Sequence, residues 1–383
     1  MIVPGIRAQS LPGLALALLM QAGIAGAAAP PPEKHWPQFE AFVQRFVSTD
    51  GRVVDPISAP RYTTSEGQGY ALFFALVADD RALFERLLVW TRDNLAAGDF
   101  AAHLPAWQWG LRSDGNWGVA DANPAADADL WLAYTLLEAG HIWEERRYRV
   151  LGKLIAHRIL AEETADLPGL GRTMLPAPTG FHPTPERWRL NPSYGPVPLL
   201  RGLVLADETN ADAWRALAAS AQALITDSAS QGYAPDWTLF ETGRGFLADA
   251  ETGGIGSYNA IRVYLWAGLM ANDESRAAQL AALSGMADRV PPPEVVETVT
   301  GRARGEGPSG FAAALIPFQR ALRHESAAAT LAARVAAAGW PVEGYYDSVL
   351  TLFAQGHEER RYCFDADGRL HHLPEPSACA PEH

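Results

Sequence analysis

The chain has 383 residues, of which 48% are hydrophobic and 20% are charged. This composition supplies a large core and excludes a chain that is disordered over most of its length. The formal net charge of −13 argues against nucleic acid as a partner, because a surface that binds nucleic acid is basic. An acidic protein can act on a neutral polymer, although charge alone names no substrate.

Residues 1–29 have the pattern of a cleavable signal peptide. Arg7 is followed by an apolar run over residues 11–20 and then by small residues. We expect cleavage between Ala25 and Pro30, which removes one positive charge and gives −13 − 1 = −14 for the mature protein. The run is too short to favour a spanning helix, and no later stretch is apolar enough to span a bilayer. We therefore expect a periplasmic or secreted protein without stable membrane insertion.

Helical patterns dominate residues 30–383, which we interpret as a single domain with a loose C-terminal tail. Apolar residues recur at helical spacing, and residues 67–78 are apolar on nearly every face, as in a buried helix. Strand-like alternation is scarce and limited to short pieces such as Arg361 to Phe364. The predicted helices cover residues 38–47, 67–78, 81–95, 127–139, 147–161, 192–205, 211–226, 256–270, 274–286, 310–322, 327–338 and 345–355.

Long loops rich in Gly, Pro, Trp and Asp cover residues 96–123, 167–191 and 232–254. Loops of this length in a compact domain are usually functional. They alternate with shorter connections, which indicates antiparallel helix pairs whose long loops gather on one face. Periodicity alone therefore predicts a large, single, all-α domain.

The two cysteines, Cys363 and Cys379, both lie near the C-terminus. An oxidising compartment permits a bridge between them, and two unpaired thiols in a loose tail are the alternative. Their spacing does not match a metal site, and His371 and His372 in the expected tail are weak metal candidates. The sequence implies neither a metal nor an organic cofactor.

The first candidate for chemistry is Glu66, in the segment TTSEGQGY at residues 63–70. Thr63 and Glu66 have capping-box spacing, which favours a structural role at a helix start. Against that role, Gly67 and Gly69 are poor helix residues that let a ligand or a backbone approach closely. If Glu66 is a general acid, burial or a neighbouring carboxylate must outweigh the helix dipole and raise its pKa.

Two further groups of polar residues begin predicted helices. Asp127 has a position from which it can cap its helix, but Asp127 and Asp129 are two residues apart and do not share a face. We therefore expect different tasks for them, one facing a cleft. Asn259 and Arg262 are three residues apart, which places both on one helix face.

The loops carry many aromatic residues, most of which we expect to serve packing. Sugar rings have apolar faces edged by hydroxyl groups, and aromatic platforms suit them. Glycosidases need two carboxyl groups flanking the bond, so acids with tryptophan-rich loops favour carbohydrate hydrolysis. The sequence lacks a Gly-rich phosphate loop and a serine nucleophile elbow. The candidates for sugar contact are Trp107, Trp109, Tyr194, Trp237 and Arg262.

Several ordered segments together resemble glycoside hydrolase family 8, and within it the periplasmic endoglucanases of bacterial cellulose-synthesis systems. The resemblance runs from about Trp36 to about Gly356. It implies an (α/α)6 barrel of about twelve helices whose long loops form an open substrate groove, and inverting hydrolysis of internal β-1,4 bonds in glucan. It rests on TTSEGQ (63–68), LPAW (104–107), DADLW (127–131), RLNPSY (189–194) and SYNAIR (257–262).

The resemblance also implies roles for single residues. Glu66 falls at the family's proton donor, which outweighs the capping interpretation, and Asp127 falls at an acid that orients the sugar and water. One position departs from the family pattern, because the aspartate that serves as base is Asn259 here. A neutral amide cannot take a proton from water, but with Arg262 it can hold the water by hydrogen bonds.

Three interpretations of Asn259 stay open. Another carboxylate serves as base, with Asp127, Asp249 and Glu251 as candidates; or activity is weak and sustained by the acid and substrate distortion; or the chain binds glucan without cutting it. The leading hypothesis is an endo-acting β-1,4-glucan hydrolase that works with bacterial cellulose synthesis. Its expected partners are cellulose chains and the cellulose synthase export machinery. The alternative is a catalytically weak glucan-binding protein, and action on chitosan or xylan ranks lower.

Overall fold

The computed structural model describes residues 1, 35–58, 61–340 and 344–372. The chain divides into two units, residues 1–30 and residues 31–383, and the second unit holds every helix and strand described. The expected signal peptide, apart from Met1, and Cys379 lie outside the described residues. No helix in the described part of the chain is long and apolar enough to cross a membrane.

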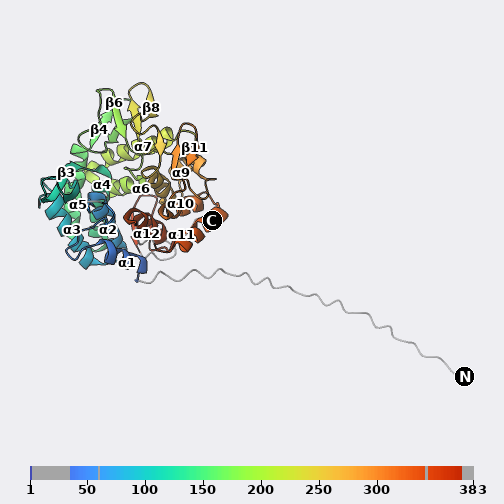
Figure 1. Ribbon diagram of the computed structural model, residues 1–383, viewed down its shortest axis with the longest axis horizontal. Helices are drawn as coiled ribbons and strands as arrows, with labels where there is room; N and C mark the ends of the chain where they lie inside the picture. Colours follow the sequence, from blue (N-terminus) through green and yellow to red (C-terminus); the bar gives the residue numbers. More distant parts are fainter. Residues whose placement is uncertain (2–34, 59–60, 341–343, 373–383) are drawn as a thin grey trace. The chain divides into compact units, whose positions relative to one another are not determined.

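The described residues form twelve α-helices, which confirms the predicted number (Figure 1). The largest shift is in α6, which begins five residues later than predicted because Pro196 and Pro198 occupy its N-cap and first turn. The helices are α1 (Pro37–Phe46), α2 (Ser65–Val77), α3 (Arg81–Leu95), α4 (Ala126–Ile142), α5 (Arg146–Glu162), α6 (Val197–Ala206), α7 (Ala211–Ser228), α8 (Ala260–Leu269), α9 (Glu274–Ala282), α10 (Ser309–Ala321), α11 (Glu325–Ala338) and α12 (Tyr345–Glu358).

The even-numbered helices form an inner layer, and the odd-numbered helices cover it. Every residue of α8 and nearly every residue of α2 is buried, whereas α9 and α11 bury only a few. Along the inner layer, α2 packs on α4, α4 on α6, α8 on α10 and α10 on α12. The outer partners are α3, α5, α7, α9 and α11 in order, and α1 pairs with α12. This is the expected (α/α)6 barrel.

An aromatic cluster locks the inner helices together at the centre of the barrel. The ring of Trp131 on α4 lies 5.0 Å from Phe73 of α2, 5.3 Å from Trp266 of α8 and 5.1 Å from Phe353 of α12. Each such pair contributes about 0.5–1.5 kcal/mol beyond its buried area. The cluster therefore fixes the positions of the first turns of α2, α4 and α8.

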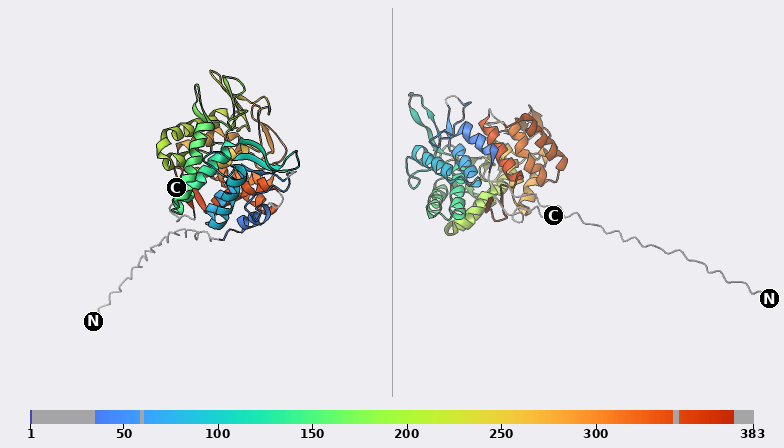
Figure 2. Two further views of the ribbon diagram at one scale, coloured as in Figure 1. Left: turned by 90° about the vertical axis from the view of Figure 1, so that its left-hand side faces the viewer. Right: turned by 90° about the horizontal axis from the view of Figure 1, so that it is seen from below.

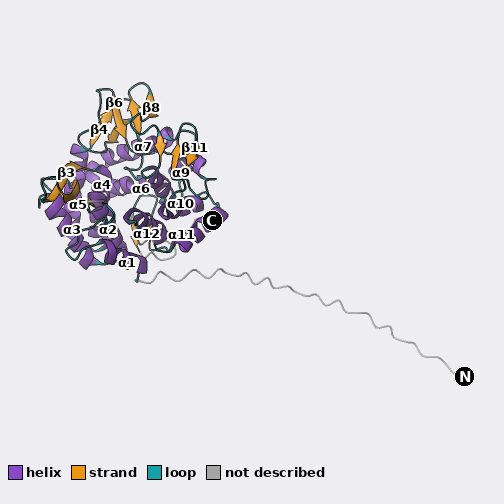
Figure 3. Cartoon of the chain, viewed as in Figure 1, coloured by secondary structure: helices purple, strands orange, loops and turns teal. Residues whose placement is uncertain are grey.

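The prediction that strands are scarce was wrong. Short antiparallel strands form five small sheets in the connections. Strands β3, β4, β6, β8 and β11 lie at the edge of the ring of helices (Figure 3), and hairpins project beyond the helices (Figure 2). Most of these strands have two to four residues, too few for alternation to be recognised. The sheets are β1 (Thr63–Thr64), β2 (Ala106–Leu111) and β3 (Trp117–Pro124); β4 (Thr164–Leu167) and β5 (Gly171–Met174); β6 (Arg187–Leu190), β7 (Thr238–Glu241) and β8 (Gly245–Ala248); β9 (Ile255–Gly256), β10 (Val295–Glu297) and β11 (Arg302–Arg304); and β12 (Tyr362–Phe364) and β13 (Leu370–His372).

The last described residues are not a loose tail, in contrast to the placement expected for His371 and His372. Strands β12 and β13 form a hairpin that buries Tyr362, Phe364 and Leu370 against the core. Cys363 in this hairpin is disulfide-bonded, and His371 pairs with Asp365 at 2.9 Å. Apolar burial holds this end of the chain in place.

Candidate active site

Glu66 is the second residue of α2 and points away from the helix cap. Thr64, not Thr63, caps the helix, because its hydroxyl accepts a hydrogen bond from Gly67 N at 3.1 Å. The Thr63 hydroxyl instead donates to Val53 O at 2.5 Å. The capping box considered for Thr63 and Glu66 is therefore not formed, and the carboxyl group of Glu66 is available for other contacts.

The glycines that follow Glu66 allow neighbours to come close, as their position suggested. A Cβ atom on Gly67 would lie 2.8 Å from the Tyr345 hydroxyl, and one on Gly69 would lie 3.3 Å from Ala128 O. Any larger residue at position 67 would force Tyr345 to move. The glycines thus cost helix propensity but bring α12 and the start of α4 against α2.

Asp127 and Asp129 have different surroundings, as expected from their spacing. Ala125, not Asp127, occupies the N-cap of α4, and Asp127 Oδ1 accepts from Ala128 N at 2.9 Å. The capping role considered for Asp127 is therefore not found. Asp127 Oδ2 instead accepts from Arg262 at 2.9 Å, whereas Asp129 faces the carboxyl group of Glu163.

Arg262, in the first turn of α8, joins the first turns of three inner helices. Its Nη1 donates to Glu66 Oε2, to Asp127 Oδ2 at 2.9 Å and to the Tyr70 hydroxyl at 3.1 Å. Its Nη2 donates to Asn259 Oδ1 at 2.9 Å. The structure therefore brings the sequence-predicted Glu66, Asp127, Asn259 and Arg262 into one hydrogen-bonded cluster, and adds Tyr70.

Glu66 has the protonation behaviour that a general acid needs. Its side chain is 23% exposed, and that of Asp127 only 3%. Burial raises the pKa of Glu66, Arg262 opposes the rise, and the charge of Asp127 and its hydrogen bond reinforce it, so the pKa reaches about 7. Burial and the neighbouring carboxylate thus outweigh the helix dipole, which is the condition stated from the sequence.

The amide group of Asn259 has a defined orientation. Its Oδ1 accepts from Arg262 Nη2 at 2.9 Å and from Asn191 Nδ2 at 3.0 Å. The opposite orientation would place N–H groups against these two donors, so the oxygen must face them. Among the described residues Asn259 Nδ2 has no hydrogen-bond partner, so the group that remains for water or substrate is a donor.

Asp236 is a polar residue of this cluster that the sequence did not single out. Its Oδ1 accepts from the backbone N–H groups of Ser257, Asn259 and Ala260 at 2.8, 3.0 and 2.8 Å. Burial raises the pKa of Asp236, while these three hydrogen bonds oppose the rise. Asp236 thus caps α8 and fixes the backbone of Asn259. Its only signal in the sequence was a place next to Trp237.

The other two candidate bases form a separate cluster. Arg189 donates to Asp249 at 3.2 and 3.1 Å and pairs with Glu251 at 3.1 Å. Asp249 is buried, and Thr252 also donates to it at 2.8 Å. Neither acid hydrogen-bonds with the cluster of Glu66 among the described residues, so the structure does not bring Asp249 or Glu251 together with Asn259.

The four aromatic candidates lie in different settings. Tyr194 is closest to the acids, with its ring 5.6 Å from the Arg262 guanidinium and 5.8 Å from the ring of Trp237. Trp237 already packs against Phe181 at 5.5 Å and against the Arg189 guanidinium at 4.4 Å. These partners occupy much of the surface that a sugar would use.

The remaining aromatic candidates lie on the β2–β3 hairpin. Trp109 stacks on Trp117 at 5.5 Å and pairs with Thr63 of β1, three residues before Glu66. Trp107 is half-buried on the same strand. Trp117 is 50% exposed and therefore offers the most accessible ring surface on this hairpin.

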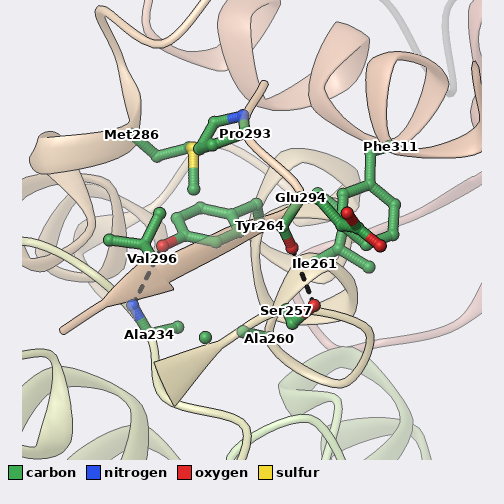
Figure 4. A pocket seen from close by; sticks show the side chains of 11 residues that line it. Ala234, Ser257, Ala260, Ile261, Tyr264, Met286, Pro293, Glu294, Val296 and Phe311 are labelled. Atoms are coloured by element: carbon green, nitrogen blue, oxygen red, sulfur yellow. Dashed lines mark hydrogen bonds between the residues drawn. The ribbon is translucent and has the colours of Figure 1, made fainter. Parts of the chain in front are cut away.

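One small hollow adjoins the cluster at the start of α8 without including its acids. Figure 4 shows Ser257 and Ala260 on its wall, with Tyr264 and Glu294, and Ser257 donates to the backbone oxygen of Glu294 at 2.7 Å. The wall is mainly apolar, and its one carboxyl group, that of Glu294, accepts a hydrogen bond from the Tyr258 hydroxyl at 3.3 Å. Within the described residues, no group of three or more His, Cys, Asp or Glu side chains could hold a metal ion.

Comparisons with known proteins identify the family of the chain. The family model described as "Glycosyl hydrolases family 8" matches residues 14–360. The endoglucanase of Xanthomonas axonopodis pv. citri (strain 306) is 45% identical over 383 residues, 98% of each chain. The endoglucanase of Escherichia coli (strain K12) is 42% identical over 354 residues, 91% of this chain and 94% of that protein.

A solved structure gives the same result for the fold. The endo-1,4-D-glucanase from Vibrio fischeri ES114 matches with a TM-score of 0.84 and 40% identity, covering 88% of this chain and 99% of that chain. The resemblance stated from the sequence is thus confirmed over nearly the whole described fold. The chain belongs to glycosyl hydrolase family 8 and is a glycoside hydrolase.

Proposed function

We propose that this glycoside hydrolase is an inverting endo-β-1,4-glucanase in which Glu66 protonates the leaving oxygen. The observation that carries the proposal is the hydrogen-bonded cluster of Glu66, Asp127 and Arg262, in which the pKa of Glu66 is about 7. A carboxyl group with this pKa holds its proton in a large fraction of molecules near neutral pH and can release it to the substrate. The endoglucanase names of the relatives support the same substrate class.

In this mechanism the acid and its neighbours act in sequence. Glu66 donates its proton to the glycosidic oxygen, and the carboxylate left behind is already in contact with Arg262. Asp127 carries a negative charge that stabilises the positive charge developing on the sugar ring. Arg262 holds both acids in place while water attacks the anomeric carbon from the opposite face. The proton of that water passes to bulk solvent, because Asn259 cannot take it.

Asn259 limits the second half of the reaction. Its free Nδ2 can hold a water oxygen by donating to it, but it cannot take the proton from that water. Asp249 and Glu251 are held by Arg189, and Asp127 is already engaged with Arg262. We therefore propose that hydrolysis is slow, since loss of a general base costs about 10²- to 10⁴-fold in rate.

The orientation of Asn259 favours one second candidate function, a glucan-binding protein that does not cut. Such a protein keeps the aromatic surfaces and Arg262 but lacks a base.

In either case we propose export to the periplasm or the medium through the N-terminal signal, and participation in bacterial cellulose synthesis with cellulose chains as ligand. The support for a role in cellulose synthesis is the resemblance of the sequence to endoglucanases of bacterial cellulose-synthesis systems. A contact with the cellulose synthase export machinery would follow from that role.

The test uses the mature protein with a soluble cellulose derivative. Release of reducing ends and loss of viscosity are measured for the parent, Glu66→Gln and Asn259→Asp. An endo-acting enzyme lowers the viscosity early, and Glu66→Gln should abolish both signals. A silent parent that becomes active as Asn259→Asp would instead identify a binding protein that has lost its base. Silence of all three proteins, with no affinity for cello-oligosaccharides, would contradict both functions.

A further inference from the structure

The mechanism above leaves two fully buried acids without a task. Asp129 lies in the first turn of α4, and Glu163 follows directly after α5. Both are 0% exposed. Within the described residues, no group outside these two carboxyls donates a hydrogen bond to any of their four oxygens. The two carboxyl groups face each other, and a hydrogen bond between them requires a shared proton because an ionised carboxylate only accepts.

The charged groups around this pair disfavour its ionisation. Asp127 and Glu162 act on both members, and both are acids. Two arginines of the adjoining segments have partners other than this pair. Arg158 pairs with Glu162 at 2.6 Å, and Arg172 donates to the backbone oxygen of Leu160 at 2.7 Å. Loss of the shared proton would therefore leave two adjacent buried charges without a cation, which is strongly unfavourable.

The pair lies at a junction of backbone segments. Leu175 N donates to Glu163 O at 2.7 Å and closes the base of the β4–β5 hairpin, and Ala126 N donates to Pro176 O at 3.0 Å. The Asp129–Glu163 contact adds a side-chain link between the start of α4 and the end of α5. Asp127 belongs to the same turn of α4 as Asp129. Any movement of this turn would therefore change the contact of Asp127 with Arg262.

We propose that Asp129 and Glu163 are positioning residues whose shared proton holds the first turn of α4 so that Asp127 meets Arg262 and Glu66. The link to catalysis rests on the function proposed above, whereas the shared proton does not. Burial raises the pKa of both carboxyl groups well above the ordinary range. Loss of the shared proton as pH rises would loosen the turn, because it would leave two buried negative charges side by side.

The sign of the effect on stability follows from linkage. The folded-state pKa values are raised above the unfolded values of about 4, so this contribution to stability is complete below about pH 4 and is lost as pH rises toward the folded values. An amide in place of one acid supplies an N–H donor that cannot be lost. Asp129→Asn and Glu163→Gln should therefore flatten the fall of Tm with pH, while Glu163→Ala should lower Tm at every pH.

The experiment compares these variants with a matched control on the same helix. Glu138→Gln is that control, because Glu138 is a buried acid of α4 that has its own partners, Leu370 N at 3.3 Å and Arg369 at 3.6 Å. Infrared spectra at about pH 8, above the pKa of about 7 of Glu138, report the carbonyl band of a protonated carboxylic acid. The parent and the control should show the band, and the double variant Asp129→Asn/Glu163→Gln should lose it.

The positioning role has its own readout. Near pH 6, Glu163→Gln should keep kcat and KM within about twofold of the parent, and Glu163→Ala should lower kcat about tenfold. If the parent does not hydrolyse glucan, the same comparison is made on its affinity for a soluble cello-oligosaccharide. An unchanged band in the double variant, or a Tm–pH slope equal to that of the parent in the amide variants, would overturn the shared proton. Equal losses for Glu163→Gln and Glu163→Ala would overturn the positioning role.

Discussion

Two clusters in this molecule have the same ingredients, two carboxyl groups and one arginine beside an aromatic ring, but they differ in chemistry. In the first cluster, the buried Arg262 contacts Glu66 and Asp127 and lies 5.6 Å from the ring of Tyr194. Burial raises the pKa of Glu66, Arg262 lowers it and Asp127 raises it again, with the result of about 7. Glu66 in this cluster can therefore donate a proton near neutral pH.

In the second cluster, Arg189 holds Asp249 with two hydrogen bonds and lies 4.4 Å from the ring of Trp237. Its other acid, Glu251, is 72% exposed. Burial favours a higher pKa for Asp249, but the hydrogen bonds from Arg189 and Thr252 outweigh it, and the pKa of Asp249 is lowered. This cluster keeps its charge and anchors the β6–β7–β8 sheet.

The comparison teaches that residue types alone do not determine the role of an acid. Arg262 donates hydrogen bonds to two carboxyl groups that also contact each other. Asp249 instead accepts two hydrogen bonds from Arg189 and a further one from Thr252. Burial, the number of donors per carboxyl group and the distance to the next negative charge together decide whether the acid titrates near neutral pH.

The largest expected effect comes from removing the acid of the first cluster. Glu66→Gln should lower kcat/KM on a soluble cellulose derivative by about 10³-fold, because the amide has no proton to donate at useful pH, and binding of cello-oligosaccharide should persist. Glu251→Gln in the second cluster is the matched control and should stay within about twofold of the parent. Comparable losses in both variants would remove the functional distinction between the clusters.

The next largest effect is a gain of activity when a base is added to the first cluster. Asn259→Asp should raise kcat about 10²-fold, because one oxygen stays bound by Arg262 and Asn191 while the second replaces the free Nδ2 and can accept a proton from water. The pH profile of the variant should gain a fall on the acid side. If the parent is fully active and the substitution changes nothing, the base lies elsewhere.

A smaller effect is a shift in the pH profile. Activity that needs protonated Glu66 is present below about pH 7 and is lost as pH rises above it. Asp127 raises the pKa of Glu66, so Asp127→Asn should move this alkaline fall to lower pH, together with a loss of kcat. The same substitution at Asp249 should leave the midpoint unchanged. A shift to higher pH in Asp127→Asn would contradict the assigned cause.

The smallest effects concern stability within the second cluster. Asp249→Asn should lower the free energy of unfolding by about 1–3 kcal/mol, because it weakens hydrogen bonds of a buried charged pair. Glu251→Gln should change it by less than about 1 kcal/mol, since this ion pair is exposed. Urea unfolding monitored by tryptophan fluorescence measures both, and a larger loss for Glu251→Gln would reverse the order of the two acids.

The sequence by itself determined the twelve helices and the positions of Glu66, Asp127 and Arg262 near helix starts. Helical periodicity is a local property, and each apolar face can be recognised in a window of about 11–18 residues. Motif resemblance then identified the family and the departure at Asn259. The short strands were missed because two to four residues carry no recognisable alternation.

Only the tertiary structure decided which of these residues meet. Asp236 caps a helix that begins more than twenty residues later, and the orientation of the Asn259 amide is set by Asn191, which lies before α6. Asp129 lies in α4 and Glu163 follows α5, and neither has a local signal for the other. The pKa of Glu66 likewise depends on burial and on charges brought by α4 and α8. These properties arise from long-range packing of the inner helices, which no local pattern of residues encodes.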